Sequence, residues 1–144
     1  MSSDVTSTPP LAECLGRLAL FADLSEEALE GLASSVEEEH FGEGEWILRQ
    51  GDANCGLHVI LEGEASVVVD DVDRAVLHAG MVFGEISALL DEPVTASVVA
   101  RTRMRCAAIS RSELLPFLLG NPVVTLRLLQ AEARRLADTI RWHA

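Results

Sequence analysis

The sequence contains no lysine and no tyrosine, and acidic residues outnumber basic ones about two to one. All 11 basic residues are arginine, against 23 aspartate and glutamate residues, and the formal net charge at pH 7 is -12. Nucleic acids and anionic membranes are bound mainly through cationic side chains that displace counterions. The charge therefore argues against direct binding of either, and a small-molecule ligand is the expected partner.

Cysteines and export signals are also scarce. The sequence has three cysteines, an odd number without paired spacing: Cys14, Cys55 and Cys106. The first segment, MSSDVTSTPP, has neither a basic region nor an apolar run, and charged residues interrupt every hydrophobic stretch before the roughly 18 residues of a membrane span. We expect a cytoplasmic protein with free thiols, no membrane span and no iron–sulfur cluster, which needs about four thiolate ligands.

Apolar side chains, by contrast, are abundant. Hydrophobic residues make up 49% of the 144 residues, enough for one core but not for two. The polar residues 1–10 end in Pro9-Pro10 and are predicted to form a disordered tail. Residues 11–144 are predicted to form a single domain.

The spacing of hydrophobic residues changes along the chain. Leucines between Leu11 and Leu20 predict a short helix, and Ser25 is the predicted N-cap of a second one. From Val36 the period becomes about 2, and glycines separate short β-favouring runs such as EWILRQ, LHVILEG, EASVVVD, RAVLHAG and TASVVARTRMRCAAIS. The predicted fold is mainly β with flanking α, an antiparallel double-stranded β-helix or jelly-roll-like β-roll.

Helical spacing returns towards the end. Ser112 is a predicted N-cap, Gly120 ends that segment, and a longer C-terminal helix is predicted over residues 122–143. It carries a heptad-like stripe, formed by Leu126, Leu129, Ala133, Leu136 and Ile140. Either this stripe packs on the sheet of its own chain, or it packs on a second copy and makes a homodimer.

Two segments carry a resemblance to a known family: GEWILRQGDANCGLHVILEGEASVVV and FGEISALLDEPVTASVVA. Together they resemble the cyclic nucleotide-binding domain of catabolite-activator-type (Crp/Fnr) regulators, protein kinase A regulatory subunits and nucleotide-gated channels, over about residues 21–140. The most specific matches are Gly51-Asp52, Gly63, and Phe83-Gly84-Glu85 with Pro93 downstream. The resemblance implies N-terminal helices, a short cassette helix inserted between strands, and cAMP or cGMP as the ligand.

The resemblance also implies roles for residues of the cassette. Backbone N–H groups after Gly84, including those of Ile86 and Ser87, would hold the cyclic phosphate, since glycine permits close approach. Glu85 would accept a hydrogen bond from the ribose 2'-hydroxyl. The remaining implied binding residues are Phe83, Thr95 and Ala96, the last two beside the phosphate.

Val94 departs from the family pattern, because it stands where such a sensor carries the arginine that binds the phosphate. Loss of a buried charge-assisted pair costs about 2 to 5 kcal/mol, so the sequence predicts a weakened phosphate site. Three explanations stay open. The missing cation is replaced by Arg101, Arg103 or Arg105; the ligand is less anionic; or the pocket is filled by its own side chains and the domain is a ligand-independent protein-interaction scaffold.

A metal enzyme of cupin type is a more distant alternative. His58 and Glu62 point to the same face of a strand, but a metal site needs three or more convergent ligands. No nucleophile, acid/base pair or metal motif stands out, so we expect neither a metal nor catalysis.

We therefore expect a regulatory or sensor module related to signalling or transcription. Ligand entry at the cassette would reposition the terminal helix, which would carry the change to a partner copy or an output domain. The transcription-factor members of the family continue into a helix-turn-helix, which this sequence does not contain. The domain is thus expected to act alone or with an output domain outside this chain.

Overall fold

The computed structural model describes residues 10–53 and 56–141. The helices are α1 (Leu11–Gly16), η2 (Ala19–Phe21), α2 (Glu26–Ser35), α3 (Glu85–Leu90), α4 (Arg111–Gly120) and α5 (Pro122–Arg141). The strands are β1 (Glu37–Phe41), β2 (Trp46–Leu48), β3 (Leu57–Glu62), β4 (Ala65–Val69), β5 (Val72–Leu77), β6 (Val82–Phe83), β7 (Ser97–Ala100) and β8 (Met104–Ile109). The predictions for residues 1–9, Cys55 and residues 142–143 lie outside the described residues.

The strands form a two-sheet roll, as predicted. Within the described residues, all pairs are antiparallel, and the two four-stranded sheets have the orders β1-β8-β3-β6 and β2-β7-β4-β5. Strand β3 is buried over most of its length because it is covered on both faces. Val59 faces the helices and Ile60 faces the second sheet, so alternate residues enter two separate cores.

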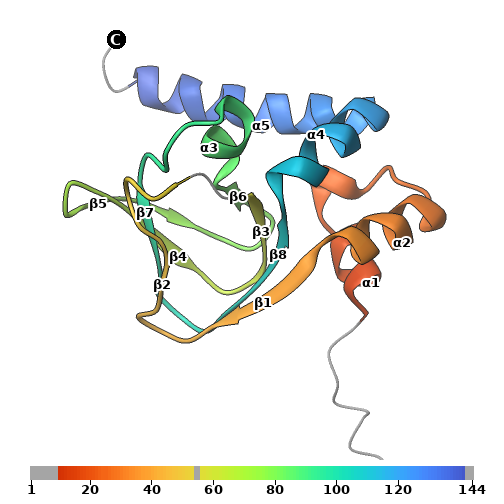
Figure 1. The fold of residues 1–144 in the computed structure, drawn as a ribbon. Helices are drawn as coiled ribbons and strands as arrows, with labels where there is room; N and C mark the ends of the chain where they lie inside the picture. The colour runs from red at the N-terminus through yellow and green to blue at the C-terminus, as the bar shows by residue number, and fades with distance from the viewer. Residues whose placement is uncertain (1–9, 54–55, 142–144) are drawn as a thin grey trace, which may run out of the picture.

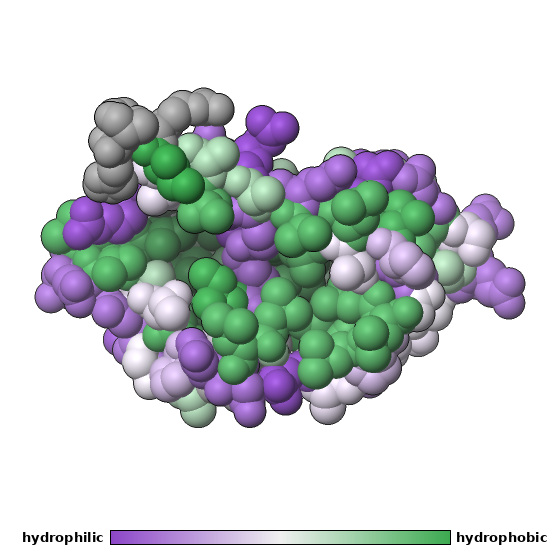
Figure 2. All heavy atoms as spheres, turned by 90° about the horizontal axis from the view of Figure 1, so that it is seen from above, coloured by the Kyte–Doolittle hydropathy of each residue, from purple (hydrophilic) through white to green (hydrophobic). Residues whose placement is uncertain are grey.

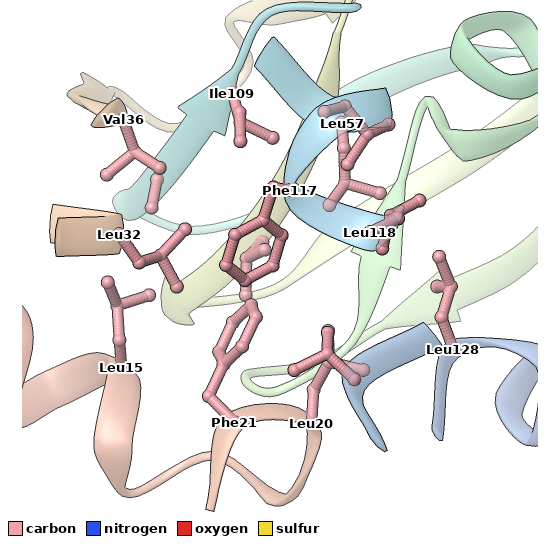
Figure 3. Close-up of a pocket in the computed structure, with 14 residues that line it drawn as sticks. Leu15, Leu20, Phe21, Leu32, Val36, Leu57, Ile109, Phe117, Leu118 and Leu128 are labelled. Carbon is pink, nitrogen blue, oxygen red and sulfur yellow. The ribbon is translucent and has the colours of Figure 1, made fainter. Parts of the chain in front are cut away.

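The helices lie at two places on this roll (Figure 1). The N-terminal helices and α4 pack against the β1-β8-β3-β6 sheet, while α5 runs across the end of the roll above α3. Figure 3 shows the core beneath the helices, where Phe21 and Phe117 meet edge to face with ring centroids 6.4 Å apart. The cavity left there is about 20 Å³ and lined by apolar side chains, far too small for a nucleotide.

Helix caps and strand limits follow the sequence with local exceptions. Ser25 caps α2 as predicted, accepting a hydrogen bond from the Ala28 N–H at 3.1 Å. The predicted cap at Ser112 is wrong, because α4 begins at Arg111 and its N-cap is Ser110. The leucine segment is also divided, since α1 ends at Gly16 and a separate turn of 3-10 helix follows.

The segment TASVVARTRMRCAAIS is two strands rather than one. The chain leaves β7 after Ala100, turns at residues 101–103, and returns as β8. Gly63 lies between β3 and β4 and packs against this turn. Its φ is 94°, and a Cβ at this position would lie 2.3 Å from the Arg103 carbonyl oxygen. Glycine at position 63, one of the matches to the family pattern, is therefore required by the packing of the two backbones.

Helix α5 has a buried face and an exposed face. Val124 and Leu128 are buried in the core under the helices. The heptad-like stripe does not pack on the sheet of its own chain, because Leu126, Leu129, Leu136 and Ile140 are 52 to 63% exposed. Figure 2, which looks onto this end of the molecule, shows hydrophobic side chains gathered there.

No single helix among the described residues is long and apolar enough to cross a membrane. Helices α4 and α5 reach that length and composition only when taken together, and they are bent by 111° at their junction.

Candidate ligand-binding site

The cassette helix α3 is bounded by two residues with left-handed backbone. Gly84, with φ 82°, precedes the helix, and Asp91, with φ 56°, follows it. The Ser87 hydroxyl donates a hydrogen bond to the Glu92 carbonyl oxygen at 2.5 Å and so closes the following turn onto the helix. These local features hold α3 as a compact insertion between β6 and β7.

All eight residues named from the sequence line one cavity beside α3. Its volume is about 140 Å³, and its walls come from both ends of the cassette, the second sheet and α5. The lining residues are Leu48, Val67, Leu77, Phe83, Gly84, Glu85, Ile86, Ser87, Val94, Thr95, Ala96, Val98 and Arg135. The two halves of the predicted site therefore face the same space.

Val94 forms an apolar part of this wall. It is 5% exposed and packs in the core between the sheets. Its N–H donates to the Asp52 carbonyl at 2.9 Å, and its carbonyl accepts from the Gly51 N–H at 2.8 Å. The Gly51-Asp52 turn thus fixes the backbone at position 94, with a side chain that carries no charge.

Glu85 is the buried acidic residue of the cavity. Glu85 is only 3% exposed. Burial and the nearby Glu132 carboxyl together raise the pKa of its carboxyl to about 7, and Arg135 opposes this rise. A carboxyl in this state exchanges a proton near neutral pH. It remains able to accept hydrogen bonds from a hydroxyl or from a cation.

Arg135 of α5 is the charged residue of the cavity wall that sequence reasoning missed. Its Nη1 donates to the Glu85 Oε2 at 2.8 Å, and its Nη2 donates to the Val82 carbonyl at 2.6 Å. The same Nη1 lies 3.5 Å from the Glu132 Oε2. In the sequence Arg135 flanks the leucine stripe, and its position on the face of α5 opposite that stripe was the available signal.

None of the three arginines proposed from the sequence reaches the cavity. Arg101 and Arg103 are exposed at the turn between β7 and β8. Arg105 is buried, but on the opposite side of the roll, where it pairs with Glu38, lies 3.6 Å from the Glu62 carboxylate and donates to the Cys14 Sγ at 3.4 Å. Of the three, only Arg105 lies in a strand, because β8 begins at Met104.

Within the described part of the chain, the structure does not assemble a metal site around His58 and Glu62, the residues that suggested a cupin-type enzyme. The His58 Nε2 lies 3.2 Å from the Glu39 Oε1, and the His58 ring stacks on Phe83 with centroids 4.8 Å apart. Among residues 10–53 and 56–141 there is no group of three or more His, Cys, Asp or Glu side chains that could hold a metal ion. Cys106 is a free thiol in the core, and burial raises its pKa to about 12.

Comparison with known proteins agrees with this geometry. A family model described as "Cyclic nucleotide-binding domain" matches residues 38–121, more than half of the chain. The chain belongs to the cyclic nucleotide-binding domain family. The two antiparallel four-stranded sheets with flanking helices match the fold of that family.

Relatives carry the domain in larger and different proteins. The cGMP-dependent protein kinase of Plasmodium berghei (strain Anka) is 33% identical over 125 residues, which cover 86% of this chain but 14% of the kinase. A mutant of the cAMP-binding acyltransferase from Mycobacterium smegmatis superposes with a TM-score of 0.77 at 30% identity, covering 88% of this chain and 41% of the acyltransferase. The N-terminal domain of a transcriptional regulator from Streptomyces coelicolor A3(2) gives 0.66 at 32% identity, covering 88% and 94%.

Proposed function

We propose that this domain binds a cyclic nucleotide, cAMP or cGMP, and acts as a regulatory module. The observation that carries the proposal is the convergence of both cassette ends, residues 83–87 and 94–96, on one cavity with a buried carboxyl at Glu85. The related kinase and acyltransferase have cGMP and cAMP in their names, which supports this ligand class.

The output is proposed to run through α5 and a second copy of the chain. Arg135 connects α5 to the cavity, while the stripe on the other face of the same helix exposes four large aliphatic side chains. A stripe with this spacing is suited to pairing with an identical helix. The role proposed is thus transmission of ligand occupancy to an assembly, without catalysis by this domain.

Calorimetric titration of cAMP and of cGMP into the protein tests the ligand. Saturable binding is expected, and Glu85→Gln should weaken it by about 10-fold or more, because hydrogen bonds to a charged acceptor contribute about 1.5 to 3 kcal/mol. Glu92→Gln is the matched control, since it removes an exposed carboxylate from the same segment. Equal affinity in all three proteins would contradict the proposed role of Glu85.

A protein-interaction scaffold is the second candidate, and Val94 is the observation that favours it. The cavity has an apolar wall at the position of the family arginine. The scaffold function would be preferred if the unmodified chain failed to bind cAMP or cGMP while the Val94→Arg variant bound. That result would mean that the cassette lacks only its cation.

A further inference from the structure

The charge balance of the cavity raises the question of what neutralises an anion inside it. Of the 13 described residues that line the cavity, Glu85 and Arg135 are the ones with ionisable side chains. Burial of an anion is costly unless a cation or several hydrogen-bond donors pair with it. Arg135 is therefore the one basic side chain that the described walls of this cavity offer.

The position of Arg135 leaves donors available. Its two hydrogen bonds, to Glu85 and to the Val82 carbonyl, use two of the five N–H hydrogens of a guanidinium. Its side chain is 34% exposed, so the group lies at the border between the cavity and solvent. A second anion can approach the same guanidinium without the loss of both existing hydrogen bonds.

We propose that Arg135 is the residue that pairs with the phosphate of the ligand in this chain, in place of an arginine at position 94. The inference rests on the proposed function, because it concerns the same cavity. In this arrangement Glu85 holds the guanidinium at the cavity wall, and the phosphate accepts hydrogen bonds from its remaining N–H groups. The binding cation is then supplied by α5 rather than by the cassette.

This assignment has a mechanical consequence. A cation on the cassette would let the ligand bind whatever the position of α5, whereas a cation on α5 requires that helix to lie over the cavity. Ligand affinity and the position of α5 are therefore determined by the same contact. The opposite role would be competition: if Arg135 blocks Glu85 by pairing with it, the ligand must displace Arg135, and removal of Arg135 would strengthen binding.

Titration calorimetry with cAMP as the probe separates these roles. Arg135→Gln should weaken binding by about 10-fold or more, as expected for loss of a charge-assisted hydrogen bond from a half-buried guanidinium. Arg134→Gln is the matched control: it removes the same charge from the same helix at an exposed residue that does not line the cavity, and it should leave the affinity unchanged. Arg135→Lys should bind more tightly than Arg135→Gln, because it retains the charge.

A second substitution keeps the test independent of folding defects. Val94→Arg restores a cation at the family position, so the double variant Val94→Arg with Arg135→Gln should regain the binding that Arg135→Gln loses. Thermal unfolding of each variant verifies that it is folded.

Each remaining outcome has a distinct meaning. Equal or tighter binding by Arg135→Gln overturns the inference and leaves the cyclic nucleotide function standing. Absence of binding by the unmodified chain together with binding by Val94→Arg also overturns it, since Arg135 then fails to supply the cation. Absence of binding by both proteins overturns the inference and the proposed function together.

Discussion

Glu85 places a carboxyl group where its charge is poorly solvated. Burial and the neighbouring Glu132 raise the pKa to about 7 from an ordinary value of 4.5, even with Arg135 at 2.8 Å. The folded protein therefore keeps a proton on this carboxyl that the unfolded chain releases above pH 4.5. Unfolding becomes more favourable as the pH rises through this interval.

The free energy of unfolding is thus expected to decrease between pH 4.5 and about 7, by on the order of 3 kcal/mol from this group, since one pKa unit corresponds to about 1.4 kcal/mol. Urea unfolding at a series of pH values measures it. Glu85→Gln should flatten the profile in this window, and Glu132→Gln should shift the decrease to lower pH. A profile identical in all three proteins would contradict the assignment.

Gly63 gives a prediction about stability alone. Gly63→Ala places a Cβ 2.3 Å from the Arg103 carbonyl oxygen at a backbone φ of 94°, and the left-handed backbone by itself costs a non-glycine residue about 1 to 2 kcal/mol. We expect a loss of at least that size in urea unfolding. Gly42→Ala is the control, because a Cβ there meets no atom within 4 Å. Equal stability of both variants would refute the explanation for Gly63.

The sequence predicted one side of the candidate site and missed the other. Residues 83–87 and 94–96 are close in the chain, so local spacing was enough to group them. Arg135 is 50 positions from Glu85, and its contact depends on the path of α5 across the roll. Nothing in local periodicity encodes that path, whereas Arg101, Arg103 and Arg105 were considered because they are near in sequence.

At the scale of elements, α5 has hydrophobic side chains on two faces. The heptad-like stripe, which is the more regular of the two, faces outward. The periodicity correctly predicted the helix and its stripe, but it could not distinguish an internal partner from an external one. The packing excludes the internal partner, because the face of α5 that meets the core is the one that carries Val124 and Leu128. The cap of α4 was predicted at Ser112 although it lies at Ser110, because a second serine two residues away offers the same side chain.

The outward stripe predicts an assembly that depends on it. The unmodified chain is expected to sediment as a dimer, and a variant with Leu129→Glu and Leu136→Glu as a monomer. Both side chains are at least 60% exposed, so the free energy of unfolding of the isolated chain should change little. Sedimentation velocity at several concentrations measures the association.

Gln130→Glu is the control for this variant, because it adds negative charge to an exposed position of α5 off the stripe. It should remain dimeric. A monomeric unmodified protein at high concentration would contradict the proposed pairing.

At the scale of the whole molecule, the net charge of -12 opposes compaction. Salt screens repulsion among exposed charges, with a Debye length of about 10 Å at 0.1 M, and affects the closely paired Arg105 and Arg135 less. The midpoint of urea unfolding is therefore expected to rise when sodium chloride is added from low to moderate concentration. A falling midpoint would mean that exposed ion pairs outweigh the general repulsion.

The hydrogen bond between Arg135 and Glu85 joins α5 to the cassette, which lies 50 positions earlier in the chain. Under thermodynamic linkage, any factor by which ligand binding changes the self-association constant must equal the factor by which self-association changes ligand affinity. The protein concentration itself would then set the ligand threshold. Dilute and abundant pools of the same chain would respond to different nucleotide levels without any change in sequence.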